Sequence, residues 1–127
     1  MPAYGTLTTP SCPYKGDSYL LWNNETPPTG ATSERIAVSY APDGNPAYYS
    51  IQIVFAGAPG TFEIDLQESD TDTDADYVTT GTGTTTVDAN NVARFNTPTP
   101  VLANFLRLIM KTQSSNSEAV TAQITRQ

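Results

Sequence analysis

The side chains best suited to chemistry are concentrated in one acidic run, LQESDTDTDADYVTT, at residues 66–80. Four aspartates alternate there with small residues: Asp70, Asp72, Asp74 and Asp76. Carboxylate oxygens at this spacing are typical of the first half of a calcium loop. The second half does not match, because Ala75 stands where that loop needs glycine and Gly81 where it needs a bidentate glutamate.

Three interpretations of the acidic run remain open. Without a cation the four carboxylates repel one another, so the run is either a loop spread into water or a weak cation site of another design. It could also steer and orient docking on a positively charged partner. We predict no high-affinity metal, and the four aspartates are the first ligands to test if calcium binds.

Other patterns that could carry catalysis are weak. Glu63 and Asp65 lie two apart on one strand face, a spacing compatible with a glycosidase pair but more typical of a wet strand face. The segment GTGTTT at residues 81–86 lacks the lysine of a phosphate-binding loop, so we expect a flexible loop. Cys12 is the only cysteine and the chain has no histidine. We therefore predict a protein that is not an enzyme and uses no cofactor.

Composition and charge restrict the partners. The net charge is −7, and the six basic residues are scattered along the chain, so we expect neither nucleic-acid nor anionic-membrane binding. No run is long and apolar enough for a signal peptide or a membrane span, which predicts synthesis in a cytoplasm.

Short alternating segments separated by turn signals predict an all-β fold. The clearest strand is TFEIDLQE at residues 61–68, in which every second residue is apolar. Further strands are expected at residues 19–24, 35–41, 48–57, 77–80, 92–97, 104–113 and 118–127, with hairpin turns at residues 88–91 and 114–117. Only residues 101–110 could hold a helical turn. The predicted core is Ile51, Ile53, Phe55, Phe62, Ile64, Leu66, Leu106 and Leu108.

These segments predict an antiparallel β-sandwich of about eight to nine short strands, of jelly-roll or immunoglobulin-like type. We expect one domain at residues 19–127. Residues 1–18 contain three prolines and no helical period, so we expect an extended N-terminal arm that lies on a neighbour.

Two segments contain more apolar residues than a strand with one solvent-exposed face requires. NFLRLIM at residues 104–110 is apolar on both faces, and YLLW at residues 19–22 brings anchor-type aromatics. We expect these segments and the arm to contact another subunit or a partner. The candidate interface residues are Tyr4, Leu7, Tyr14, Tyr19, Leu21, Trp22, Phe105 and Ile109.

The second half of the chain resembles small virion proteins of tailed bacteriophages. The resemblance runs from about Phe62 to Arg126. It is carried by the segments FEIDLQESDTDTDADYVTT, VARFNTPTPVLANFLRLIMKTQ and AVTAQITR. It implies a capsid decoration (cement) protein, or a β-sandwich module of the neck, tail or fibre.

We therefore expect a non-enzymatic virion protein, made in the host cytoplasm, that binds and stabilises the phage head lattice. Its partners would be the major capsid protein or other virion proteins and further copies of itself, as a dimer or trimer. The alternative is a carbohydrate-binding module, of a phage fibre or a bacterial surface protein, that stacks sugars on Trp22 and the seven tyrosines. Binding to host cells or a glycan array, compared with binding to capsids lacking the protein, would separate the two.

Overall fold

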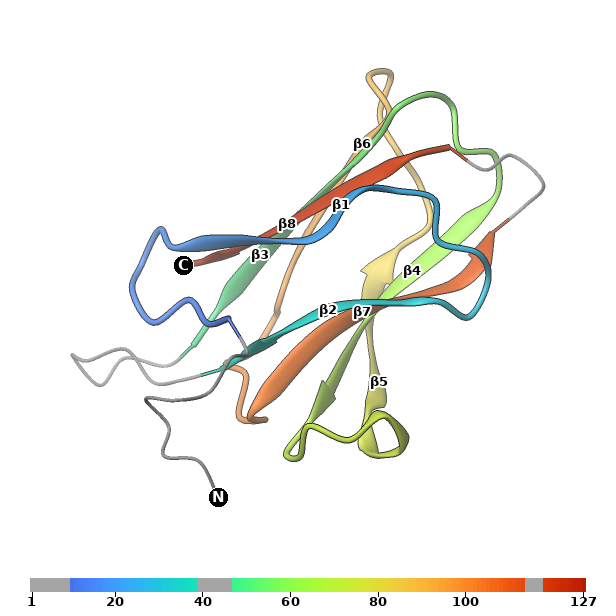
Figure 1. Ribbon diagram of the computed structural model, residues 1–127. Coiled ribbons are helices and arrows are strands. Elements are labelled where there is room, and N and C mark those ends of the chain that lie inside the picture. Colours follow the sequence, from blue (N-terminus) through green and yellow to red (C-terminus); the bar gives the residue numbers. More distant parts are fainter. Residues whose placement is uncertain (1–9, 39–46, 114–117) are drawn as a thin grey trace.

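The computed structural model describes residues 10–38, 47–113 and 118–127. This part of the chain forms eight strands in two antiparallel sheets of four, which pack face to face (Figure 1). The predicted all-β sandwich is confirmed. The strands are β1 (Ser18–Glu25), β2 (Thr32–Ala37), β3 (Tyr49–Phe55), β4 (Phe62–Ser69), β5 (Val78–Thr84), β6 (Val92–Asn96), β7 (Phe105–Gln113) and β8 (Val120–Arg126).

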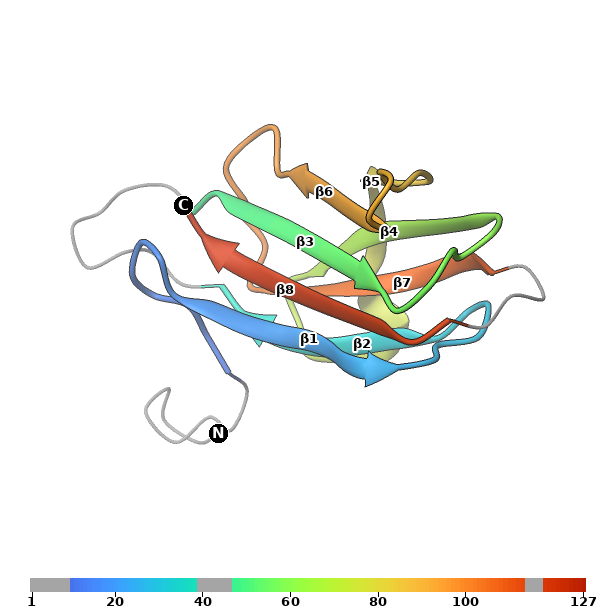
Figure 2. The same cartoon turned by 90° about the horizontal axis from the view of Figure 1, so that it is seen from above.

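Successive strands mostly alternate between the two sheets. One sheet has the order β1-β8-β3-β6 and the other β2-β7-β4-β5, and Figure 2 shows the first of these lying across the second. Among the described strands, β4 and β5 are the one consecutive pair that forms a hairpin. The hairpins predicted at residues 88–91 and 114–117 are wrong, because β5 and β6, like β7 and β8, lie in different sheets. Residues 114–117 themselves lie outside the described part.

Four of the six strand pairings in the described part of the chain are nested, first strand with last. β1 pairs with β8, β2 with β7, β3 with β6 and β4 with β5, all antiparallel. This is the result of folding one long antiparallel ribbon, closed by the β4–β5 hairpin, over itself. The immunoglobulin order differs, since its first two strands are neighbours in one sheet.

The inner faces of both sheets form one hydrophobic core. All eight residues predicted for it are buried, which confirms the alternation seen in the sequence. Phe55 and Phe62 meet across the sandwich with ring centroids 4.8 Å apart. The buried core also contains Cys12, Tyr49, Met110, Val120, Ala122 and Ile124.

A bulge places two consecutive β1 residues in the core. The β1–β8 register shifts between Leu20 and Trp22, so that both Leu21 and Trp22 are buried. Strict alternation would have turned one of them outward. Their side chains therefore present no surface to a partner, contrary to their prediction as interface anchors.

The described end of the predicted arm, residues 10–17, packs on the sandwich. Ser11 bridges Ala37 in parallel, and the Gly16 amide donates to the Arg126 carbonyl at 2.8 Å. Cys12 is fully buried in the core. Residues 10–17 are thus part of the folded body, and residues 1–9 lie outside the described part.

Two local predictions differ from the structure. Residues 81–84, expected in a loop, belong to β5, where Gly81 adopts a positive φ of 84°. A Cβ on Gly83 would lie 2.1 Å from the Ile64 carbonyl oxygen, so this strand needs glycine to pair closely with β4. The possible helical turn in residues 101–110 is absent, and β7 begins at Phe105. No helix within the described ranges has the length and hydropathy needed to cross a membrane.

Candidate functional site

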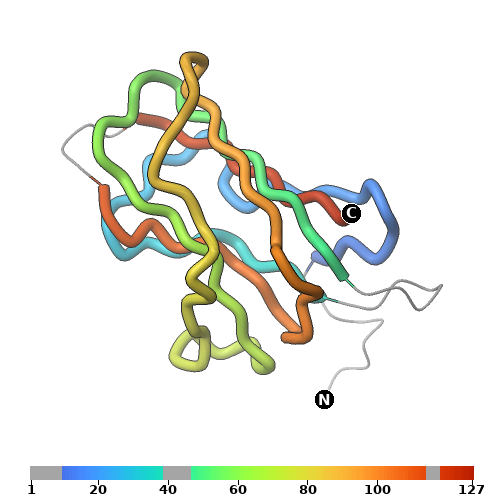
Figure 3. Tube along the Cα trace, turned by 180° about the vertical axis from the view of Figure 1, so that it is seen from behind, coloured from blue at the N-terminus to red at the C-terminus, as the bar shows by residue number. Residues whose placement is uncertain are grey.

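The acidic run connects β4 to β5 and folds back over the outer face of its own sheet, at one end of the sandwich (Figure 3). Two arginines hold it there. Asp74 Oδ1 accepts from Arg107 Nη1 at 2.9 Å and from Arg35 Nη2 at 3.2 Å. Asp72 forms a second ion pair with Arg35. The positive charges that pair with Asp72 and Asp74 therefore belong to side chains of strands β2 and β7.

Arg107 is the centre of this contact. Its residue is only 5% exposed, although it lies on the outer face of the sheet. Its Nε donates to Gln67 Oε1 at 2.9 Å, and its guanidinium lies 3.8 Å from the centroid of the Tyr77 ring. Stacking and paired hydrogen bonds offset much of the cost of burying the charge.

The loop also has internal bonds that shape it. Thr71 Oγ1 donates to Asp76 Oδ2 at 2.5 Å, and Asn104 Nδ2 donates to the Asp70 carbonyl at 3.0 Å. The short 3-10 helix η2 (Asp74–Asp76) leads directly to Tyr77, which covers Arg107. Burial raises the pKa of Tyr77, and the hydrogen bond to Asp72 raises the pKa of Arg35. Both groups therefore keep their charge state across the neutral range.

These contacts revise the interpretation of the acidic run. From the sequence we considered a loop spread into water or a bound metal ion, but not a counter-charge from the protein itself. Arg35 and Arg107 supply that charge by pairing with Asp72 and Asp74. Within residues 10–38, 47–113 and 118–127, no three acidic or cysteine side chains are grouped so that they could hold a metal ion. Residues 70–76 all remain exposed, so the geometry is compatible with a solvated loop and with docking on a partner through Asp70 and Asp76, which lie outside the arginine pairs.

The two carboxylates considered for glycosidase chemistry, Glu63 and Asp65, both form salt bridges with Lys111. Lys111 Nζ lies 3.1 Å from Glu63 Oε2 and 3.4 Å from Asp65 Oδ2. The hydrogen bond to Glu63 raises the pKa of Lys111. A salt bridge across neighbouring strands accounts for this pair.

The opposite outer face, on the sheet β1-β8-β3-β6, has a different composition. Its rows, read from the strand register, are Ser18–Thr125–Ser50–Asn96, Leu20–Gln123–Gln52–Arg94 and Thr121–Val54–Val92. We call these residues the neutral face. It carries hydroxyls, amides and one arginine but no carboxylate, although the chain has a net charge of −7. Depletion of acidic and lysine side chains is the compositional mark of a protein interface.

The predicted interface residues do not form one patch. Tyr14 is 59% exposed, whereas Tyr19 is packed partly against the core. Phe105 and Ile109 are half-buried on the outer face of β7, on either side of Arg107. Tyr4 and Leu7 lie outside the described residues, and Leu21 and Trp22 are in the core.

The sequence held signals for both surfaces. Arg107 interrupts the apolar run NFLRLIM, and a charge within such a strand must find a partner. The outward positions of SIQIV and VTAQIT hold Ser, Thr and Gln instead of Lys and Glu. Neither signal shows by itself which distant residues it meets.

Comparison with known proteins found no matching family model, no significantly similar curated protein and no significantly similar solved structure.

Proposed function

We propose that this protein is a non-enzymatic structural component of a bacteriophage virion, a decoration protein that binds the head lattice. The observation that carries the proposal is the neutral face, a sheet surface without carboxylates on a strongly acidic protein. Apart from Arg94, whose guanidinium donates to Gln52, such a face can approach another protein closely without burying a charge.

The charge distribution supports one orientation. The neutral face and the acidic loop belong to different sheets, on opposite sides of the sandwich. With the neutral face against the lattice, the acidic loop and its arginines point away from it into solvent. Binding only the assembled state would then stabilise the head by mass action.

The strand pairing supports a jelly roll over an immunoglobulin-like sandwich. The pairs β1·β8, β2·β7, β3·β6 and β4·β5 wrap one ribbon into two sheets, and jelly rolls are common in viral capsid proteins. This support is an analogy of fold. The proposal includes a dimer or trimer and an arm at residues 1–9 that clamps a neighbour.

Among the alternatives, a neck, tail or fibre module would use the same face. A carbohydrate-binding module is less well supported, because Trp22 is buried and offers no face on which a sugar could stack.

The test is binding of the purified protein to phage heads that lack it, measured by co-sedimentation and electron microscopy. Gln123→Lys adds a positive charge in the same row as Arg94 on a face that has no carboxylate to pair with it, and we expect it to weaken binding at least about tenfold, as a desolvated, unpaired charge should. Thr32→Lys, at an exposed position of β2 in the other sheet, is the matched control and should bind normally.

Equal binding by both variants would refute the neutral face as the contact surface. Absence of the chain from purified virions by mass spectrometry would refute the virion proposal as a whole. Light scattering of the free protein tests the dimer or trimer.

A further inference from the structure

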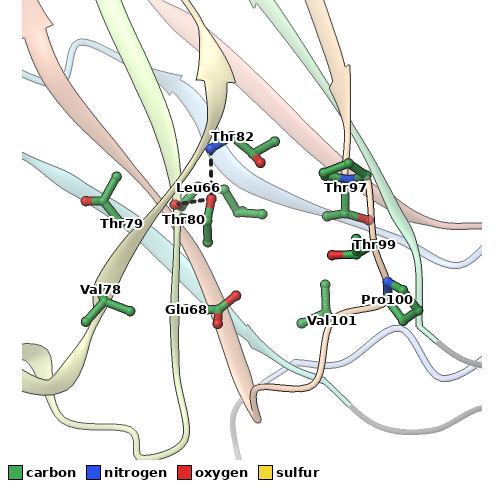
Figure 4. Close-up of a pocket in the computed structure, with 11 residues that line it drawn as sticks. Leu66, Glu68, Val78, Thr79, Thr80, Thr82, Thr97, Thr99, Pro100 and Val101 are labelled. Carbon is green, nitrogen blue, oxygen red and sulfur yellow. Dashed lines mark hydrogen bonds between the residues drawn. The ribbon is translucent and has the colours of Figure 1, made fainter.

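An open groove of about 270 Å3 lies between the edge strand β5 and the segment that links β6 to β7. Figure 4 shows the side chains of β4 and β5 on one side and those of residues 97–101 on the other. Its rim includes Val78, which is 60% exposed, together with Pro98 and Pro100. These three residues give the mainly threonine-lined groove an apolar rim on which an aliphatic chain could pack.

Glu68 stands where the sequence pattern calls for an apolar residue. In β4, Phe62, Ile64 and Leu66 point inward, and Glu68 continues their side of the strand. Its carboxylate lines the groove, and no ion pair or hydrogen bond of this side chain occurs among the described residues. A carboxylate that faces the groove without an ion pair attracts a cation that enters the groove.

The hydroxyls of two threonines in the groove, Thr80 and Thr97, form hydrogen bonds within the protein. Thr80 Oγ1 donates to the Leu66 carbonyl at 3.0 Å and accepts from the Thr82 amide at 3.0 Å. Thr97 Oγ1 accepts from the Tyr49 amide at 3.0 Å, and Thr79 Oγ1 lies 3.4 Å from Gln67 Nε2. The methyl groups of Thr80 and Thr97 remain to contact a ligand. The carboxylate of Glu68 selects the occupant, because a neutral polyol would leave it without a cation, whereas an aliphatic chain with a positive end would pair with it.

The wall opposite β5 is fixed in place. The amides of Thr97 and Val101 donate to the carbonyls of Tyr49 at 2.9 Å and Ala47 at 2.8 Å. Pro98 and Pro100 between them restrict φ and have no N–H to add to a sheet. The groove is therefore preformed, which lowers the entropic cost of binding.

We propose that this groove binds a basic side chain, a lysine or an arginine, of a partner protein. The aliphatic stem packs on Val78 and the prolines, and the cationic end pairs with Glu68. Charge complementarity argues for this occupant, because the free carboxylate belongs to a chain with a net charge of −7. The inference does not depend on the virion proposal and is tested on the purified protein alone.

The probes are N-acetyl-lysine methylamide and its norleucine counterpart, which has the same stem without the ammonium group. We expect the lysine probe to bind with a Kd on the order of millimolar, as a single small fragment should. Amide resonances of Thr80, Thr99 and Val101 in 1H–15N spectra should shift with the lysine probe and not with norleucine.

Two variants and one condition complete the experiment. Glu68→Gln should abolish the shifts, whereas Glu63→Gln, whose carboxylate pairs with Lys111 on the outer face, should keep them. Raising the salt from about 50 mM to about 500 mM should weaken binding of the lysine probe to the unaltered protein several-fold. This measurement keeps the proposal testable even if the Glu68→Gln variant does not fold. Equal shifts with norleucine, persistence in Glu68→Gln, salt-independent binding, or lysine shifts confined to residues 70–76 would each overturn the proposal.

Discussion

Replacing Arg107 by methionine tests whether the arginines fix the acidic loop. Methionine keeps the unbranched stem but removes the hydrogen bonds to Gln67 and Asp74 and the stacking on Tyr77. A charged hydrogen bond contributes about 1.5–3 kcal/mol and a cation–π contact about 0.5–2 kcal/mol. Asp74 is largely exposed, at 78% of its side chain, so its share is at the lower end.

Part of this loss is recovered, because the variant no longer incurs the free-energy cost of removing a guanidinium charge from water at a site that is only 5% exposed. We therefore expect a net loss of about 2 kcal/mol in the free energy of unfolding. For a domain of this size that lowers the Tm by roughly 8 °C. The measurement is thermal and urea unfolding at low salt, followed by circular dichroism.

The matched control is Arg94→Met. Arg94 lies exposed on the neutral face and contacts only the neutral Gln52 among the described side chains, so its loss should change stability by less than about 0.5 kcal/mol. A double-mutant cycle of Arg107→Met with Asp74→Asn should give a coupling of about 1 kcal/mol. If the two changes are additive, or if Arg107→Met melts within a degree of the parent, the loop is not held by this arginine.

Three further predictions use the core and the loop. Burial raises the pKa of the Cys12 thiol from 9.0 to about 11, so at pH 8 a thiol reagent should label it only after unfolding. Because this pKa is raised in the folded state, the protein should lose stability as the pH rises from about 9 to 11. The Cys12→Ala variant should not show this loss. Fast labelling of the native protein would contradict this. Phe62→Ala should cost about 3–5 kcal/mol through the cavity it leaves in the core beside Phe55, and a variant that melts like the parent would disprove the packing. Micromolar calcium should leave the Tm unchanged, and a rise of several degrees would reinstate the aspartates as ligands.

Because residues 10–17 pack on the sandwich, the clamp prediction is now tested on residues 1–9 alone. Deleting residues 1–9 should leave the sandwich folded while weakening attachment to the particle. Deleting residues 1–17 should also destabilise the fold, because Cys12 and the bond between Gly16 and Arg126 are lost. A deletion of residues 1–9 that binds particles normally would remove the clamp from the proposal.

The alternation of apolar residues was enough to predict the core strands. Phe62, Ile64 and Leu66 point inward because one face of their strand must be buried, a constraint local to the sequence. Pairing between strands is not local, and turn residues such as Asp88 serve equally for a hairpin or for a crossing between sheets. The predicted hairpins failed for this reason.

The arginine contacts were missed for a related reason. Arg35 is 37 residues from Asp72, and Arg107 is 33 residues from Asp74. Only the β2–β7–β4 order brings these side chains over one face, and no spacing within the sequence reports that order. The burial of both Leu21 and Trp22 depends likewise on a bulge set by the partner strand β8.

The position of β8 has a consequence for how the chain folds during synthesis. β8 lies between β1 and β3, so this sheet cannot form until residues 120–126 have been made. Until then β1 and β3 expose unpaired edges and apolar side chains, whereas the β4–β5 hairpin can form early from local contacts. We therefore expect the chain to fold late and slowly, and any product that ends before β8 to aggregate instead of accumulating as a smaller folded protein.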